Sequence, residues 1–193
     1  MRSYISMKEY KLYRLITYLF FPPFVAAAEV LIFSPFSKNI FGSLIVGLFF
    51  LTIYPTLLIY KKYLAGKVDI DVSERAARPE IYSVVLGSIL TSAFVFWLIK
   101  DNLMFTASLS YAIVTAAMFF LNRFSKVSTH TAGLAGPITA VVFYFGIFYA
   151  GLYILLFPVA YARFKLGMHN RLQLALGAIV GIALTYATFS LVL

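Results

Sequence analysis

The sequence predicts an all-α membrane protein, a polytopic bundle of about seven transmembrane helices, with six as the alternative count. Hydrophobic residues make up 62% of the 193 residues, and charged residues make up only 12%. An average soluble domain is about a quarter charged, so this chain lacks the polar groups that would cover a surface in water. Apolar segments of roughly 20 residues, long enough to cross a bilayer, follow one another along the chain. The length suits one helical bundle and excludes an additional soluble domain.

The chain divides into a basic N-terminal segment, residues 1–14, and a single transmembrane domain, residues 15–193. No small-residue cleavage site follows the basic segment, so it is not expected to act as a cleaved signal. Each expected span is an apolar segment between polar residues. The expected spans are residues 15–36, 41–60, 81–99, 103–122, 128–146, 148–164 and 172–193.

Residues 131–162 carry no charge, and this stretch could form either one span or two. As a single helix they would extend about 48 Å, which is too long for one span without strong tilt. Gly146 and Gly151 offer places for a turn, and we therefore expect two spans here. On the last span, Gly177 and Gly181 are four residues apart, a spacing that predicts close packing of another helix.

Positive charge is distributed unevenly between the two sides of the predicted bundle. All of the 16 Lys and Arg residues except Lys38 and Lys100 fall on alternate segments, beginning with the N-terminus. The positive-inside rule places that side in the cytoplasm. We expect an integral protein of the cell membrane, with its N-terminus cytoplasmic and its C-terminus outside. This orientation accounts for the net charge of +9, so nucleic acid is not expected as a partner.

Polar residues concentrate in three segments on the basic side, residues 67–79, 126–130 and 162–173, which include both histidines, His130 and His169. Arginine binds phosphate oxygens through two parallel hydrogen bonds, and a helix start supplies further N–H donors. Two imidazoles allow one to attack phosphorus while the other donates a proton to the leaving oxygen. The chain has no cysteine, which excludes thiolate chemistry and cysteine-bound metals. These segments therefore predict a site for phosphoryl transfer.

The spacing of these residues resembles the type-2 phosphatidic acid phosphatase family of membrane lipid phosphatases. That family has a Lys to Arg-Pro motif, then Ser-Gly-His, then Ser-Arg, five residues, His, three residues and Asp. The resemblance covers roughly residues 67–181, with the motifs in the family's order. The matching residues are Arg78-Pro79, then Ser128 and His130, then Arg163 and His169, with Gln173 at the position of the aspartate.

The resemblance implies a mechanism that uses no metal or other cofactor. His169 would attack phosphorus and form a phosphohistidine, and His130 would protonate the leaving group. Gln173 lies four residues after His169, so on a helix its carbonyl could hold the imidazole in one tautomer. The substrate would be a lipid phosphate or a polyprenyl diphosphate taken from the surrounding membrane lipids.

The remaining residues would bind the phosphate. Arg163, Ser128 and Arg78 take this role from the motifs that they match. The lysine position of the first motif holds Asp71, so Lys67 or Arg75 would have to supply that cation, and spacing does not decide between them.

Further departures define the alternatives. Thr129 replaces the family's glycine, Ala162 its second serine, and Gln173 its aspartate. A neutral partner orients His169 without stabilising the imidazolium, which by analogy with serine proteases lowers the rate by up to about 10⁴-fold. One alternative is therefore a weak or inactive relative that binds anionic lipid head groups. A magnesium-dependent transferase is another, although Asp69 and Asp71 form one acidic cluster where such sites need several convergent carboxylates. A transporter would call for paired broken helices, which the sequence does not indicate.

Overall fold

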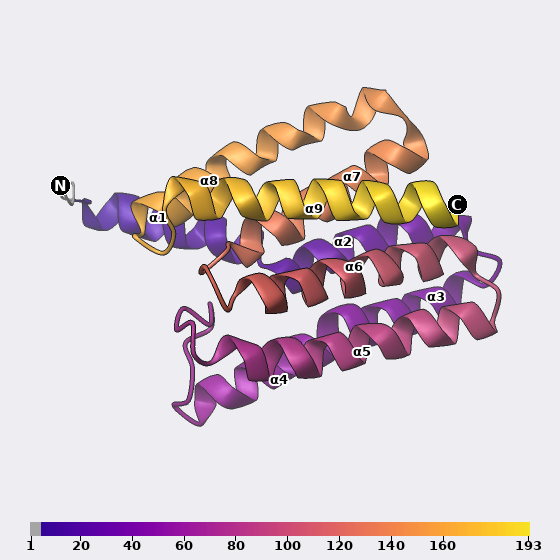
Figure 1. Cartoon of the computed structure of the whole chain (residues 1–193), viewed down its shortest axis with the longest axis horizontal. Helices are drawn as coiled ribbons and strands as arrows, with labels where there is room; N and C mark the ends of the chain where they lie inside the picture. The colour runs from indigo at the N-terminus through magenta and orange to yellow at the C-terminus, as the bar shows by residue number, and fades with distance from the viewer. Residues whose placement is uncertain (1–4) are drawn as a thin grey trace.

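The structure is a computed structural model that describes residues 5–193, and this part of the chain contains helices and no strand. The long helices lie roughly side by side in one bundle (Figure 1). The all-α fold is therefore confirmed. The elements are α1 (Met7–Leu19), α2 (Pro22–Phe33), η1 (Ser34–Phe36), α3 (Ile40–Gly47), η2 (Leu48–Ile53), α4 (Tyr54–Leu64), α5 (Arg78–Leu98), α6 (Asn102–Leu121), α7 (Thr129–Phe145), η3 (Ile147–Leu155), α8 (Leu156–Lys165) and α9 (Arg171–Val192).

Five helical segments are long and apolar enough to cross a membrane, and a sixth is added if α1 and α2 form one bent span. The five are 40–64, 78–98, 102–121, 147–165 and 171–192. Helix α7 has 17 residues, the lower limit of the roughly 17–25 that span a bilayer, and it occupies the position of the remaining predicted segment. The chain is an integral membrane protein.

The first segment differs from the prediction because its helix begins before the apolar residues do. Ser6 and Glu9 form a capping box that starts α1 at Met7 rather than at residue 15. The later part of the basic segment is thus helical, whereas Arg2 lies outside the described residues. Pro22 and Pro23 then separate α1 from α2, and the two helices meet at 44° because proline fits the first turn of a helix but not its interior.

The uncharged stretch does contain the predicted turn. Gly146 ends α7 with a φ of 103°, a conformation that favours glycine, and the chain reverses into η3 and α8. Gly151 lies within η3 and makes no turn. The expectation of two segments here is confirmed, and Gly146 is the residue that separates them.

Helix α7 packs closely against α9, as the glycine pair on the last segment predicts. A Cβ atom on Gly177 would come within 2.4 Å of the Ser128 carbonyl oxygen, and one on Gly181 within 2.6 Å of the Ala132 carbonyl oxygen. The two backbones can therefore approach each other only because these positions lack side chains. This packing fixes the start of α7, where the polar residues of the site begin.

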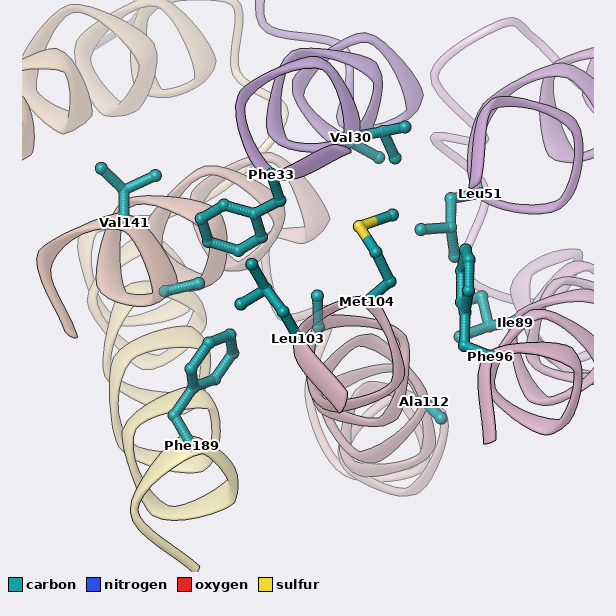
Figure 2. Packing of buried hydrophobic residues seen from close by; sticks show 13 residues of the cluster. Val30, Phe33, Leu51, Ile89, Phe96, Leu103, Met104, Ala112, Val141 and Phe189 are labelled. Atoms are coloured by element: carbon teal, nitrogen blue, oxygen red, sulfur yellow. The ribbon is translucent and has the colours of Figure 1, made fainter. Parts of the chain in front are cut away.

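A cluster of buried apolar side chains holds the bundle together away from the polar loops. Phe33 of α2, Met104 of α6 and Phe189 of α9 lie at its centre and are almost fully buried (Figure 2). Phe96 and Leu51 extend the cluster toward α5 and η2. This rigid packing supports the helix ends that carry the candidate site.

The three predicted polar segments lie at one end of the bundle. The loops α4–α5, α6–α7 and α8–α9 gather at the end where α1 begins, and the C-terminus lies at the opposite end (Figure 1). Each of these loops follows an even number of crossings of the bundle, with α1 and α2 together counted as the first crossing. The chain has therefore returned each time to the end where α1 begins. The sequence prediction that the polar segments share one face is confirmed.

Candidate functional site

Asp71 lies at the centre of the polar end of the bundle and is surrounded by basic groups. Its Oδ2 accepts a hydrogen bond from Arg14 Nη1 at 2.9 Å. Arg163 Nη1 lies 3.2 Å from the same oxygen, close enough for an ion pair but outside hydrogen-bond geometry. His130 Nε2 lies 3.9 Å from Oδ1. The carboxylate is 1% exposed, so these charges meet in a site shielded from water.

Three helices and a loop bring these groups together. Arg14 comes from α1, His130 from the first turn of α7 and Arg163 from the last turns of α8. Asp71 comes from the loop that joins α4 to α5. Charges in such a shielded place attract each other far more strongly than at a wet surface, which makes the ion pairs with Asp71 significant for the loop conformation.

Arg78 ties two loops together at the start of α5. Its Nε donates to the carbonyl oxygen of Val72, and its Nη1 donates to that of Val127, both at 3.0 Å. The side chain is buried, so these bonds hold the loop carrying Asp71 against the loop that precedes α7. The resemblance assigned Arg78 to phosphate binding. In this structure its hydrogen bonds instead hold the two loops that border the site.

His169 is held in one orientation by the backbone of another loop. Its Nδ1 lies 3.0 Å from the carbonyl oxygen of Lys126, which fixes the proton on Nδ1 and leaves the lone pair on Nε2. Nε2 is buried and has no hydrogen-bond partner. Burial, followed by the charges of Arg163 and Arg78, lowers the pKa of His169 to about 3. The imidazole is therefore neutral at physiological pH, the state that a nucleophile requires.

Ser128 positions the second histidine. Its Oγ accepts a hydrogen bond from the N–H of Thr131 and caps α7, and its own N–H donates to the Gln173 carbonyl oxygen. His130 follows in the first turn and is buried, with Nε2 lacking a hydrogen-bond partner. The Ser128 side chain was predicted to bind phosphate; here its Oγ accepts the capping bond, and its O–H donor is not used by the cap.

Lys126 adds a further positive charge at the edge of the site. Partial burial, followed by the charges of Arg78 and Arg163, lowers the pKa of its ammonium group. The local potential is therefore positive enough to disfavour an additional cation. A positive site enclosed by helix ends attracts an anion.

Several buried polar atoms around Asp71 have no hydrogen-bond partner. Buried polar groups are almost always paired with protein or water, so a group of unpaired atoms at one place marks a polar site that can accept a ligand or water. The unpaired atoms are Asp71 Oδ1, His130 Nε2, His169 Nε2, and Arg163 Nε and Nη1. Four of the five are histidine or arginine nitrogens, which can donate a hydrogen bond to a phosphate oxygen or, in the case of histidine, attack phosphorus.

Three predicted site residues have different surroundings from those expected. Gln173 does not hold His169, because its Oε1 accepts from the N–H of Asn170 in the capping box that starts α9. Arg75 donates to the carbonyl oxygens of Asn122 and Arg123 at the end of α6. Lys67 has an exposed side chain on the α4–α5 loop. Neither Arg75 nor Lys67 is among the residues found in contact with Asp71.

Arg14 and Asp71 are the site residues that the sequence did not identify. Arg14 belongs to the first helix, outside the three motifs, and was counted only among the cations that orient the protein. Asp71 occupies the lysine position of the first motif, which was the available signal. A carboxylate there needs cations around it, and a search for an unassigned arginine would have included Arg14.

An apolar cavity of about 140 Å³ adjoins the site between α2, α5, α6 and α7. Asp71, Arg78 and His130 line it at the polar end, and Ile89 and Tyr111 line it further into the bundle. Arg78 and Ile89 are eleven residues apart on α5, or about 16 Å along the helix axis. The cavity therefore extends to roughly half of the 30 Å hydrocarbon thickness, the depth of one leaflet.

Comparison with known proteins adds no assignment: no family model, curated protein or solved structure matches the chain.

Proposed function

We propose that the protein is a metal-independent phosphatase that removes phosphate from a lipid phosphate or polyprenyl diphosphate at the cytoplasmic face of the cell membrane. The observation that carries the proposal is the buried pair of imidazoles with unpaired Nε2 atoms, beside Arg163, at the polar end of an apolar cavity. A phosphate head group matches the basic end, and an isoprenoid or acyl chain matches the apolar cavity.

The proposed reaction has two steps. In the first, Nε2 of His169 attacks phosphorus, the bond from phosphorus to the leaving oxygen breaks, and His130, in its protonated form, gives that oxygen its proton. In the second, water attacks the phosphohistidine, His130 takes a proton from the water, and the P–N bond breaks to release inorganic phosphate and free His169. Both histidines return to their starting states.

The surroundings of His169 support its role as the nucleophile. The hydrogen bond from Nδ1 to the Lys126 carbonyl does what the family's aspartate does for orientation, without its negative charge. The pKa of about 3 keeps Nε2 unprotonated. Arg163, next to Asp71, is the side chain best placed to bind phosphate oxygens during both steps.

The cytoplasmic assignment rests on charge. Lys and Arg residues concentrate at the end of the bundle that holds the site, and the positive-inside rule places that end in the cytoplasm. Labelling of single cysteines introduced at each end of this cysteine-free chain tests the orientation in intact cells.

A second function has specific support, namely binding of an anionic lipid head group without turnover. Gln173 caps a helix and supplies no charge to His169, and Asp71 occupies the basic site. Such a protein would keep the site's affinity for phosphate and lose the chemistry.

Phosphate release by purified protein in detergent distinguishes these functions. The assay contains a chelator and offers a panel of lipid phosphates and diphosphates to wild type and His169→Ala. A lipid phosphatase loses its release in the variant, with the melting temperature recorded as the folding control. Equal release from both proteins refutes His169 as the nucleophile, and no release from folded wild type favours the binding function.

A further inference from the structure

We propose that the carboxylate of Asp71 occupies the place of a phosphoryl group between Arg14 and Arg163, that bound phosphate displaces it, and that Arg14 then binds the phosphate. The inference rests on the proposed function for the identity of the anion. It adds a binding residue from α1 and an internal competitor for the site.

The first argument is the match between the carboxylate and its surroundings. Carboxylate and phosphate oxygens take the same charge-assisted hydrogen bonds from arginine. Asp71 accepts from Arg14 and lies beside Arg163 and His130, the groups to which a substrate phosphate would bind. An ordinary structural carboxylate at 1% exposure would have both oxygens paired, yet Oδ1 has no hydrogen-bond partner.

The second argument is the number of unpaired donors. The carboxylate has two oxygens, and the described structure leaves Arg163 Nε and Nη1 without hydrogen bonds beside it. A phosphoryl group offers three oxygens in a tetrahedral arrangement and carries up to two negative charges. It therefore satisfies groups that Asp71 leaves unpaired, which gives phosphate the advantage needed to displace a tethered carboxylate.

The third argument is the backbone beside Asp71. Val72 has a φ of 47°, in the left-handed region that a β-branched residue rarely adopts. Strain of this kind persists only where the surroundings enforce it. The contacts around it are the ion pairs of Asp71, the hydrogen bond from Arg78 to the Val72 carbonyl, and the turn in which the Val72 N–H donates to the Asp69 carbonyl. Release of Asp71 removes part of that constraint, so the loop is prepared to move.

Titration of inorganic phosphate into the purified full chain, followed by calorimetry, tests the competition. Asp71→Asn keeps the size of the side chain and removes its charge, and we expect it to bind phosphate about tenfold more tightly, or better, the equivalent of one charge-assisted hydrogen bond. Glu74→Gln is the matched control, because Glu74 is an exposed acid on the same loop and its loss changes the net charge equally. Equal or weaker binding by Asp71→Asn overturns the proposal, and so does an equal gain in the control.

The role of Arg14 is tested in the Asp71→Asn background. If Arg14 binds phosphate directly, Arg14→Gln in this background weakens binding by about tenfold. If Arg14 serves only to neutralise Asp71, the second substitution changes nothing, and the assignment of Arg14 is overturned.

A second measurement keeps Asp71 intact, in case its substitution prevents folding. The chain has no cysteine, so Ser73→Cys introduces a single thiol two residues after Asp71. Ser73 is half-buried, with its hydroxyl at 3.4 Å from Met168 Sδ, and we expect saturating phosphate to accelerate alkylation of the new thiol as the loop leaves the site. Glu74→Cys, already exposed, should react at the same rate with and without phosphate. An unchanged rate at Ser73→Cys overturns the displacement.

These outcomes separate this inference from the proposed function. Phosphate release that requires His169, together with unchanged affinity in Asp71→Asn, refutes the competitor and leaves the phosphatase. Tighter phosphate binding by Asp71→Asn, in a protein that releases no phosphate from lipid, supports the competitor and refutes the phosphatase.

Discussion

Gly177→Ala is the substitution whose effect follows most directly from the packing of α9 against α7. The added Cβ would lie 2.3 Å from Thr131 Oγ1 and 2.4 Å from the Ser128 carbonyl oxygen, about 1 Å closer than ordinary contact, which begins at 3.4 Å. Because one of the two atoms belongs to the backbone, a change of rotamer cannot relieve the clash. The helices must move apart at the residue that caps α7.

The size of the effect combines two destabilising terms with one stabilising term. Overpacking of this kind destabilises by about 1–3 kcal/mol. Alanine is favoured over glycine within a helix by about 1 kcal/mol, which offsets part of it. Loss of the bond from Thr131 Oγ1 to the Leu174 carbonyl adds about 1 kcal/mol. The expected net loss is about 1–3 kcal/mol. Because His130 follows the displaced cap, we also expect the proposed phosphatase reaction to be slower.

Thermal unfolding in detergent measures this loss, and the chain offers a matched control. Gly87 lies within α5, and a Cβ atom there would meet nothing within 4 Å. Gly87→Ala should therefore leave stability unchanged or raise it by up to about 1 kcal/mol. If Gly177→Ala is as stable as Gly87→Ala, the close approach of α7 and α9 is refuted.

Three further predictions concern the site. Since the pKa of His169 falls from 6.5 to about 3 on folding, the unfolded chain binds a proton that the folded chain does not, and the free energy of unfolding decreases as the pH falls through this window, by up to about 1.4 kcal/mol per pH unit. His169→Gln should flatten that dependence in unfolding curves, and an unchanged slope would contradict the burial of the imidazole. Arg78→Lys cannot bridge the two loop carbonyls, so we expect a loss of about 1–3 kcal/mol in thermal unfolding, and a stability equal to wild type would count against the bridge. Gln173→Ala should change kcat only a few-fold because a backbone carbonyl holds His169; a collapse in kcat would restore the role that the sequence assigned to Gln173.

Composition and the lengths of the apolar segments were sufficient to predict the all-α class and the order of most helical segments. The apolar segments, the turn at Gly146 and the close packing at Gly177 each follow from local sequence, because a bilayer requires apolar lengths and a tight helix contact requires glycine. The start of α1 could not be predicted from hydropathy, since polar residues that form a capping box extend a helix beyond its apolar part.

The sequence predicted only those site residues that belong to a motif and that the fold also brings together. The sequence placed His130, His169 and Arg163 together, and the structure finds all three buried at one end of the bundle. It could not show that a carbonyl rather than Gln173 orients His169, because backbone acceptors carry no signature in side-chain patterns. Nor could it identify Arg14, whose position beside Asp71 depends on how α1 packs against α8.

The central claim is that His169 carries the phosphoryl group between the two steps. Its most direct test is to mix wild-type protein with the lipid phosphate or diphosphate that it hydrolyses fastest, stop the reaction in alkali, where phosphohistidine survives, and map phosphorylated peptides by mass spectrometry. The account predicts a phosphoryl group on His169 that is absent from His169→Ala. Turnover with a phosphoryl group on another residue, or on none, would contradict it.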